Sequence, residues 1–273
     1  MAKWFVLYHR HCHDGFGAAW AAWKKLGGGS EYIPVLHGAS PPNLPAGSRV
    51  ALVDFAYPRR IMEEIVAEAK QVQVLDHHLT AHDELAGLDY AHIDLSKSGA
   101  VLSWEYWHPE EPVPPLLAYV QDKDLWQFAL PDSKEVTAAL ESYPLEFELW
   151  NTFTVKRLAD EGRHILRLLQ RQVSKTADQA FFQNIAGYNV PVVNATSNTS
   201  EVLGELNRRH AKAPFAAAYF DLGDGKRHWG LASVGAFDVS KIAKGFGGGG
   251  HRNRSGFMQP AGESIASLDK GRA

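Results

Sequence analysis

The chain has 273 residues, of which 45% are hydrophobic, and its formal net charge is −3. This hydrophobic content supports a folded core and excludes a disordered chain, while the weak charge disfavours a protein that grips long duplex nucleic acid. The single cysteine, Cys12, excludes an intramolecular disulfide and fits a reducing compartment. No apolar run approaches the roughly 20 residues of a membrane span. We therefore expect a cytoplasmic protein that does not enter a membrane.

Strand and helix signals alternate through the first half of the chain. Apolar and β-branched runs predict strands at 4–8, 31–37, 48–56, 71–78 and 90–96. Helical patterns are expected at 15–29, 58–70, 98–107 and 114–126. Pro34 places the second strand near a sheet edge. Strands separated by helices of this length imply right-handed crossovers and a parallel sheet covered by helices on both faces.

The second half begins with one long amphipathic pattern over 155–185, which predicts a helix that bridges two domains. Later patterns predict a strand at 188–195, a helix at 200–212, a hairpin at 213–235 and a short helix at 238–246 with Asp238 as its N-cap. We expect an α/β protein: a parallel-sheet catalytic domain (1–150), a long connecting helix (151–185) and a smaller α/β C-terminal domain with a mixed sheet (186–273).

Polar side chains collect where the predicted parallel strands end. His9 follows the first strand, Asp54 lies late in the third, and Asp76, His77 and His78 end the fourth. Ligands bind outside the carboxyl ends of such strands, and clustered carboxylates repel one another unless a cation neutralises them. Imidazole and carboxylate together suit Mn²⁺, Mg²⁺, Fe²⁺, Co²⁺ or Zn²⁺. Two ions about 3.5–4 Å apart would serve phosphoryl hydrolysis.

Taken singly, each of these residues has an ordinary structural explanation. An Asp late in a strand is more often a turn or capping residue, and a lone His near a strand end is usually an ordinary exposed or hydrogen-bonded side chain. In the YVQDKDLW stretch, Asp122 could be a solvated helix carboxylate, and we expect Asp124 to be one. Their joint occurrence at strand ends favours the metal site.

The combination of motifs resembles the DHH family of phosphoesterases, named for the triplet found here at 76–78. The resemblance spans nearly the whole chain through HRHCHDGFGAAW, LVDF, LDHH, YVQDKDLW and the distal GFGGGGHRNRSGF. It implies a DHH catalytic domain joined to a glycine-rich C-terminal substrate domain, as in oligoribonucleases and exopolyphosphatase-like enzymes.

The resemblance also implies roles for individual residues. The implied metal ligands are His9, Asp14, Asp54, His77 and Asp122, with Asp54 bridging two Mn²⁺ ions, for which Mg²⁺ or Co²⁺ are alternatives. His78 would contact the scissile phosphate and Asp76 would orient the pair, so that the catalytic residues are Asp54, Asp76 and His78. A metal-activated water would attack phosphorus.

The first motif departs from the family pattern, because Cys12 stands where a first Asp is usual. Cys12 could be a soft ligand, a spectator, or the reason for one weak metal site, and His11 and His13 are candidates to fill the gap. The distal motif implies a substrate-binding loop that faces the metals across an interdomain cleft. Its residues are Gly248, Gly249, Gly250, His251 and Arg252.

The expected function is metal-dependent hydrolysis of small nucleotide phosphoesters. Short oligoribonucleotides, linear dinucleotides and 3′-phosphoadenosine 5′-phosphate are the favoured substrates. The expected partner is thus a small nucleotide or short single-stranded RNA, with no long duplex nucleic acid and no membrane, and a homodimer is left open. Two alternatives remain at this point: an inorganic polyphosphate or pyrophosphate hydrolase, and a catalytically weak nucleotide-binding regulator.

Overall fold

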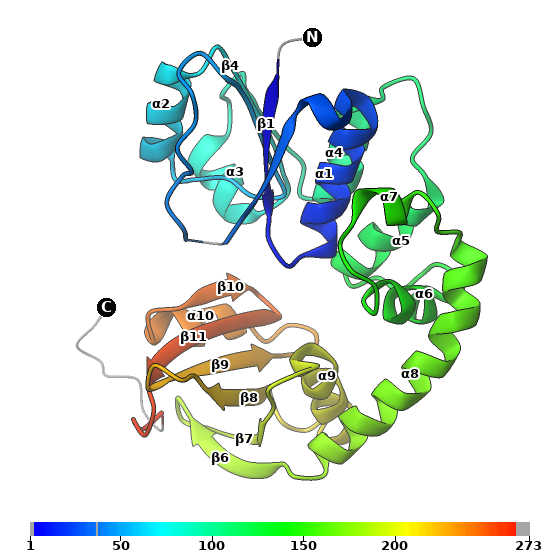
Figure 1. The fold of residues 1–273 in the computed structure, drawn as a ribbon. Coiled ribbons are helices and arrows are strands. Elements are labelled where there is room, and N and C mark those ends of the chain that lie inside the picture. Colours follow the sequence, from blue (N-terminus) through cyan, green and yellow to red (C-terminus); the bar gives the residue numbers. More distant parts are fainter. Residues whose placement is uncertain (1–2, 37, 266–273) are drawn as a thin grey trace. The chain divides into compact units, whose positions relative to one another are not determined.

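The computed structural model describes residues 3–36 and 38–265 of the chain (Figure 1). The chain divides into two compact units, Met1–Leu166 and Arg167–Ala273, and each is built around its own β-sheet. Residue 37, at the end of a predicted strand, and residues 266–273 of the predicted C-terminal domain lie outside the described residues.

The first unit contains a five-stranded sheet in which every pair of neighbouring strands is parallel. Its strands are β1 (Trp4–His9), β2 (Glu31–Val35), β3 (Arg49–Val53), β4 (Gln71–Asp76) and β5 (Ala91–Ile93), in the order β2-β1-β3-β4-β5. The prediction of a parallel sheet with the Pro34 strand at its edge is therefore confirmed. The β1 strand lies between β2 and β3, so β2 is added on one side of β1 and the later strands β3, β4 and β5 are added on the other.

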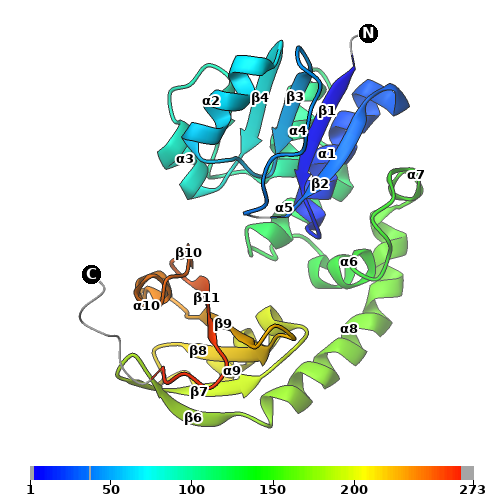
Figure 2. The same cartoon turned by 60° about the vertical axis from the view of Figure 1, so that its left-hand side comes forward.

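Helices cover both faces of this sheet (Figure 2). The helices are α1 (His13–Leu26, followed by a 3₁₀ turn at Gly27–Gly29), α2 (Arg59–Glu68), α3 (Leu79–Leu85), α4 (Gly99–Trp107), α5 (Pro115–Asp124), α6 (Ser133–Leu140) and α7 (Phe147–Trp150). Successive residues of a strand point to opposite faces. Val6 accordingly packs with alanines of α1, whereas Leu7 packs with Met62 of α2 and Leu85 of α3. Burial on both faces explains why these strands read as continuous apolar runs.

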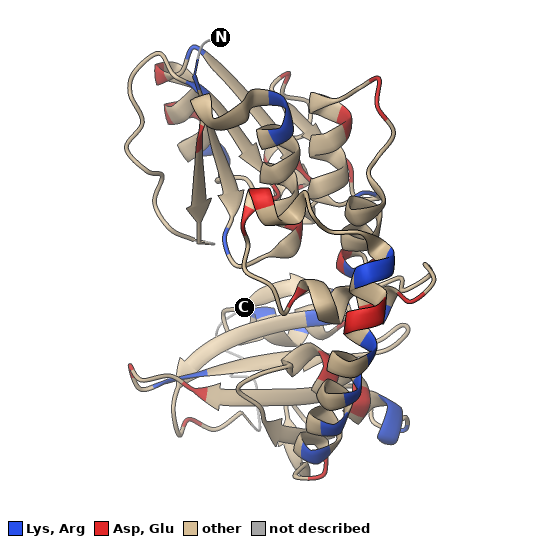
Figure 3. Cartoon of the chain, turned by 45° about the vertical axis from the view of Figure 1, so that its right-hand side comes forward, with Lys and Arg blue, Asp and Glu red and all other residues tan. Residues whose placement is uncertain are grey.

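The long helix α8 (Val155–Ala177) crosses the boundary between the two units. Its solvent side carries ion pairs at i,i+3 and i,i+4 spacing, such as Lys156 with Asp160 and Arg157 with Glu161 (Figure 3). The predicted helix over 155–185 is too long, because 181–185 form strand β6 (Phe181–Ile185) instead. Pairing of this segment with the next strand, together with complete burial of Ile185, outweighs its helical pattern.

The second unit contains a mixed six-stranded sheet, as predicted. Its remaining strands are β7 (Tyr188–Asn194), β8 (Ala216–Asp221), β9 (Lys226–Ala232), β10 (Gly249–His251) and β11 (Arg254–Pro260), in the order β10-β11-β9-β8-β7-β6. Only β7 and β8 pair in parallel. The helices are α9 (Thr199–Arg209) and α10 (Val239–Gly245). The Asp238 side chain accepts a hydrogen bond from the Ser240 backbone N–H at 3.0 Å, which confirms its predicted capping role.

Among the helices of the described residues, none combines the length and the apolar character needed to cross a membrane.

Close packing of α8 against α6 depends on a glycine, which gives a stability prediction. A Cβ added at Gly162 would overlap the Glu135 carbonyl group of α6, so Gly162→Ala should lower the free energy of unfolding by about 1–3 kcal/mol. Gly204 is the matched control, because it lies inside α9 with nothing within 4 Å of an added Cβ. Gly204→Ala should stabilise by about 0.5–1 kcal/mol. Urea unfolding of the full chain measures both, and equal stabilities would contradict the packing argument.

Candidate metal centre

The candidate centre lies at the carboxyl ends of β1, β3 and β4. His9 is the last residue of β1, Asp54 follows β3 directly, and Asp76 ends β4. In the order β2-β1-β3-β4-β5, the strand that follows β1 in sequence lies on one side of it and all later strands lie on the other. The gap between β1 and β3 is therefore a topological switch point, where ligands of doubly wound folds bind. The fold therefore gathers these polar residues at one edge of the sheet, in the position that the sequence predicted.

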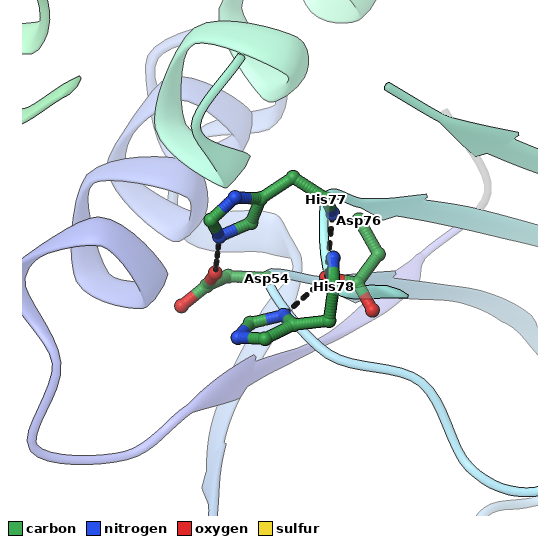
Figure 4. Close-up of side chains that lie close together, drawn as sticks. All are labelled: Asp54, Asp76, His77 and His78. Carbon is green, nitrogen blue, oxygen red and sulfur yellow. Dashed lines mark hydrogen bonds and ion pairs between the residues drawn. The ribbon is translucent and has the colours of Figure 1, made fainter. Parts of the chain in front are cut away.

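Asp54 is central to this arrangement. Its side chain is only 2% exposed; its Oδ1 lies 3.2 Å from Nε2 of His77 and its Oδ2 lies 3.5 Å from Nδ1 of His9. Figure 4 marks the Asp54–His77 ion pair, but within the described part of the chain Oδ1 accepts no hydrogen bond of good geometry. The residue has a φ of 61°, a left-handed conformation that non-glycine residues adopt rarely. One carboxylate thus presents its two oxygens to two different imidazoles.

His77 is surrounded by three carboxylates. Besides Asp54, its Nε2 lies 3.6 Å from Oδ2 of Asp14 and 3.5 Å from Oδ2 of Asp124. Burial lowers the pKa of His77, but these carboxylates outweigh it and raise the pKa to about 9. One imidazolium balances only one of the three carboxylate charges. The excess negative charge that remains would attract additional cations.

Burial and like charge also act on the carboxylates. Burial raises the pKa of Asp14 well above its usual value, and the neighbouring Asp54 and Asp124 raise it further. For Asp124, burial is again the largest cause of a raised pKa. Burial acts in the same direction on Asp54, but its contacts with His77 and His9 outweigh that effect and hold the pKa of Asp54 below the ordinary range. Asp54 is therefore the carboxylate that stays ionised most readily.

Asp14 is fixed by the start of a helix that is distant in sequence. Its Oδ2 accepts the Gly99 N–H at 2.6 Å and its Oδ1 accepts the Ala100 N–H at 2.9 Å, both in the first turn of α4. The helix dipole favours a negative charge at this end. The next residue, Gly15, packs against β1, where an added Cβ would lie 2.5 Å from the His9 carbonyl oxygen. These contacts fix the first motif against β1.

The Asp76-His77-His78 triplet forms the turn that follows β4. Asp76 Oδ1 accepts the His77 backbone N–H at 2.8 Å and lies 2.8 Å from Nδ1 of His78 (Figure 4). Burial lowers the pKa of His78, but the hydrogen bond and charge of Asp76 outweigh it and raise the pKa. Asp76 therefore orders both histidines and favours an imidazolium at His78. This geometry explains why three polar residues stand together where a buried strand stops.

The structure brings Asp124, rather than Asp122, to the cluster. Asp122 is buried elsewhere, with its carboxylate accepting hydrogen bonds from the Ala129 N–H (2.9 Å), the Leu130 N–H (3.2 Å) and the Ser133 hydroxyl. Two residues separated by two positions on a helix point about 200° apart, so only one of them can face the strand ends. The sequence alone predicts a solvated carboxylate at Asp124, because nothing in the local pattern indicates which side of α5 faces the site.

The first motif supplies His9 and Cys12 but neither of the other histidines. His9, Cys12 and Asp54 each offer a ligand atom within 4.8 Å of the others, and Asp14, His77 and Asp124 form a second such group; a third, Asp54, Asp76, His77 and His78, joins the triplet to the Asp54 carboxylate. Neither His11 nor His13 belongs to a group of this kind in the described residues. The His13 ring instead stacks on Trp150, with ring centroids 6.3 Å apart.

A cavity of about 500 Å³ opens beside the cluster within the first unit. Ligand pockets commonly have volumes of about 300–1,000 Å³. Two residues from each of the first two groups line it, namely His9 and Cys12 from one and Asp14 and Asp124 from the other, together with Tyr119 and Lys123. The cluster is therefore open to a small ligand despite the burial of its carboxylates.

The glycine-rich motif of the second unit forms a hairpin, where the sequence analysis expected a loop. Gly249–His251 pairs with β11, and an added Cβ at Gly248 would overlap the Gly256 carbonyl oxygen. Gly250 has a φ of 135°, which glycine accommodates without strain. The Arg252 guanidinium donates to the Ala236 carbonyl at 2.6 and 3.2 Å. Strand pairing and turn geometry thus account for Gly248, Gly250 and Arg252, while Gly249 has nothing within 4 Å of an added Cβ.

Comparison with known proteins gives one close sequence relative and several remote structural ones. No protein-family model matches the chain. The uncharacterized protein R106 of Acanthamoeba polyphaga mimivirus is 32% identical over 280 residues, which cover 92% of this chain and 66% of that protein. The chain thus spans just under two thirds of the length of this curated relative.

Three solved structures are similar over most of their length. An uncharacterized protein from Helicobacter pylori G27 is 15% identical with a TM-score of 0.44, and the match covers 97% of this chain and 95% of that one. The pGpG-specific phosphodiesterase PggH of Vibrio cholerae is 12% identical (TM-score 0.48; 96% and 94% covered). Manganese-bound RecJ exonuclease is 16% identical (TM-score 0.47; 93% and 85% covered). At these values the similarities carry no argument about activity.

The different positions of Asp122 and Asp124 lead to a paired prediction. Asp122→Ala should lower the free energy of unfolding by about 1–3 kcal/mol, because it leaves the Ala129 and Leu130 N–H groups and the buried Ser133 hydroxyl without their acceptor. Asp124→Ala should leave the stability of the metal-free protein unchanged or raise it, since one repelling carboxylate is removed, but should weaken Mn²⁺ binding. Urea unfolding in chelator and calorimetric Mn²⁺ titration measure the two effects. The assignment fails if the two variants exchange phenotypes.

Proposed function

We propose that this protein is a DHH-type, metal-dependent phosphoesterase that hydrolyses small nucleotide phosphoesters. The position of Asp54 carries the proposal, since its carboxylate lies between the imidazoles of His9 and His77 with one oxygen toward each. A carboxylate so placed is suited to bridge two cations. The residues on either side form two separate ligand groups that both adjoin it.

The donor set fits divalent ions. Asp14, His77 and Asp124 with Asp54 Oδ1 would hold one ion, and His9 and Cys12 with Asp54 Oδ2 would hold the other. Two bound ions would supply a water of lowered pKa and would stabilise the charge that develops on a phosphoryl group. Two features of this chain call for such ions: Asp54 Oδ1 accepts no hydrogen bond of good geometry within the described residues, and three carboxylates surround the single imidazole of His77.

Asp76 and His78 form a third group of possible ligands with Asp54 and His77, and we assign this pair to the phosphate rather than to an ion. Nδ1 of His78 lies 2.8 Å from Oδ1 of Asp76, and a protonated imidazole is a donor at both ring nitrogens, so in this proposal Nε2–H addresses a phosphoryl oxygen. Asp76 fixes the ring and raises its pKa, which favours the donating form. Asp76 thus acts as a positioning residue and His78 as the residue that touches substrate.

The substrate class rests on the family resemblance and on the size of the site. The cavity of about 500 Å³ suits a small phosphoester, and the net charge of −3 gives no broad attraction for a long polyanion. In this proposal, His251 of the second unit holds the part of the substrate that extends beyond the scissile phosphate. Short oligoribonucleotides, linear dinucleotides and 3′-phosphoadenosine 5′-phosphate are the substrates to test.

Asp54→Asn tests the bridging role. Asn tolerates the left-handed backbone of position 54, so the fold should survive while turnover on these substrates falls by several orders of magnitude. Chelator should abolish wild-type activity, and Mn²⁺ should restore it better than Ca²⁺, which prefers a larger coordination sphere. Steady-state kinetics with circular dichroism as the folding control measure these effects. Full wild-type activity in excess chelator, after residual metal has been measured and excluded, would refute the proposal.

Comparing substrates of two sizes tests the division of roles between His78 and His251. His251→Ala should reduce kcat/KM on a dinucleotide by about tenfold to a hundredfold, corresponding to the loss of one charge-assisted contact. The same variant should hydrolyse a minimal aryl phosphate nearly as the wild type does. His78→Ala should impair both substrates, because both contain the phosphate that it contacts. Equal losses on both substrates for His251→Ala would contradict its assignment to substrate recognition.

A further inference from the structure

We propose that the two ligand groups select different metals: the His9–Cys12–Asp54 group takes Zn²⁺, and the Asp14–His77–Asp124 group takes Mn²⁺ or Mg²⁺. This inference rests on the proposed function in taking the cluster as a metal centre. It follows from a difference between the groups in ligand type. One group offers a sulfur, a nitrogen and a carboxylate oxygen, whereas the other offers one nitrogen and only carboxylate oxygens.

Position and distance make Cys12 a candidate ligand rather than an isolated thiol. Cys12 is the N-cap residue of α1, three residues after the end of β1, and its sulfur lies within 4.8 Å of both His9 Nδ1 or Nε2 and an Asp54 oxygen. Ligand atoms of a tetrahedral zinc site with metal–ligand distances of 2.0–2.3 Å are about 3.5 Å apart. Side-chain rotations that move the ligand atoms by roughly an ångström would therefore bring the three atoms to the spacing of a zinc site.

A second observation independent of the thiol also points to a ligand. Asp54 is almost completely buried, yet its Oδ1, which faces His77 Nε2 at 3.2 Å, accepts no hydrogen bond of good geometry within the described residues. An unpaired buried carboxylate oxygen costs free energy unless something compensates it. Since the other oxygen lies 3.5 Å from His9, the same carboxylate serves both groups and couples their occupation.

Ligand chemistry then decides the selectivity. Thiolate is a soft donor that favours Zn²⁺ over Mn²⁺ and Mg²⁺, whereas carboxylates suit the harder ions. Three protein ligands with an open fourth position is the arrangement of catalytic zinc sites. Cys12 also lines the cavity of about 500 Å³, so that fourth position is reachable by a small ligand. The replacement of a carboxylate by Cys12 thus changes the metal rather than removing the site.

Cobalt spectroscopy provides a direct test, because Cys12 is the sole cysteine of the chain. Titration of the metal-free, full-length protein with Co²⁺ should produce a thiolate-to-cobalt charge-transfer band in the near ultraviolet. Cys12→Ser and Cys12→Asp should both lose the band. His11→Asn is the matched control: position 11 is a neighbouring imidazole outside both groups, and Asn tolerates its φ of 60°. This control should keep the band.

Metal content after incubation with one equivalent of Zn²⁺ per chain and an excess of Mn²⁺ gives the second readout, because carboxylate–imidazole sites also bind Zn²⁺ more tightly than Mn²⁺ when the two are equally available. The wild type should hold one zinc and one manganese per chain, and Cys12→Asp should shift the preference for Zn²⁺ over Mn²⁺ at this site by on the order of 100-fold toward manganese. A wild type that binds two manganese ions and shows no cobalt band would overturn the inference.

The outcomes separate this inference from the proposed function. A cobalt band and mixed-metal content without any phosphoester hydrolysis would retain the metal selectivity and refute the enzyme assignment. Hydrolysis by a protein that holds two manganese ions and shows no cobalt band would retain the enzyme assignment and refute the metal selectivity. If Cys12→Asp fails to fold, Cys12→Ser keeps the side-chain size and still reports whether the band depends on the sulfur.

Discussion

The repulsion among three carboxylates around one imidazole is the constraint on which the candidate site depends. Asp14, Asp54 and Asp124 all approach Nε2 of His77 within 3.6 Å. Burial of Asp14 and Asp54 keeps water from screening their charges, so the fold compensates these two individually. The start of α4 donates two N–H groups to Asp14, and two imidazoles face Asp54. What remains uncompensated is suited to divalent cations, which is why the geometry favours metal-dependent chemistry over a purely structural ion-pair cluster.

The fold maintains this strained arrangement through close backbone packing. An added Cβ at Gly99 would lie 2.7 Å from the Asp54 Cβ, and one at Gly15 would lie 2.5 Å from the His9 carbonyl oxygen. These two glycines allow α4 and α1 to approach the ends of β3 and β1 closely. The left-handed backbone of Asp54 costs about 1–3 kcal/mol. Such strain persists because the well-packed parallel sheet beneath it fixes the strand ends.

Neighbouring residues of one motif serve different purposes in this protein. In the fourth motif, Asp122 holds the segment after α5 through its hydrogen bonds, while Asp124 reaches the cluster two residues later. In the glycine-rich motif, Gly248 and Gly250 are required by the β10–β11 hairpin, while Gly249 has open space beside it. A motif therefore identifies a segment that matters, and only the contacts of each side chain separate its structural residues from its chemical ones.

The sequence alone determined the alternation of strands and helices, the parallel sheet, the mixed second sheet and the gathering of His9, Asp54 and His77 at strand ends. These features follow from local periodicity and from the rule that parallel strands end at one edge.

Three features were decided by tertiary structure. The end of α8 at Ala177 depends on β6 pairing with β7, a contact that local pattern does not encode. The choice of Asp124 over Asp122 depends on which side of α5 faces the sheet. The grouping of Cys12 with His9 and Asp54, rather than His11 or His13, depends on how the chain turns from β1 into α1. In each case the deciding contact joins residues that packing alone brings together.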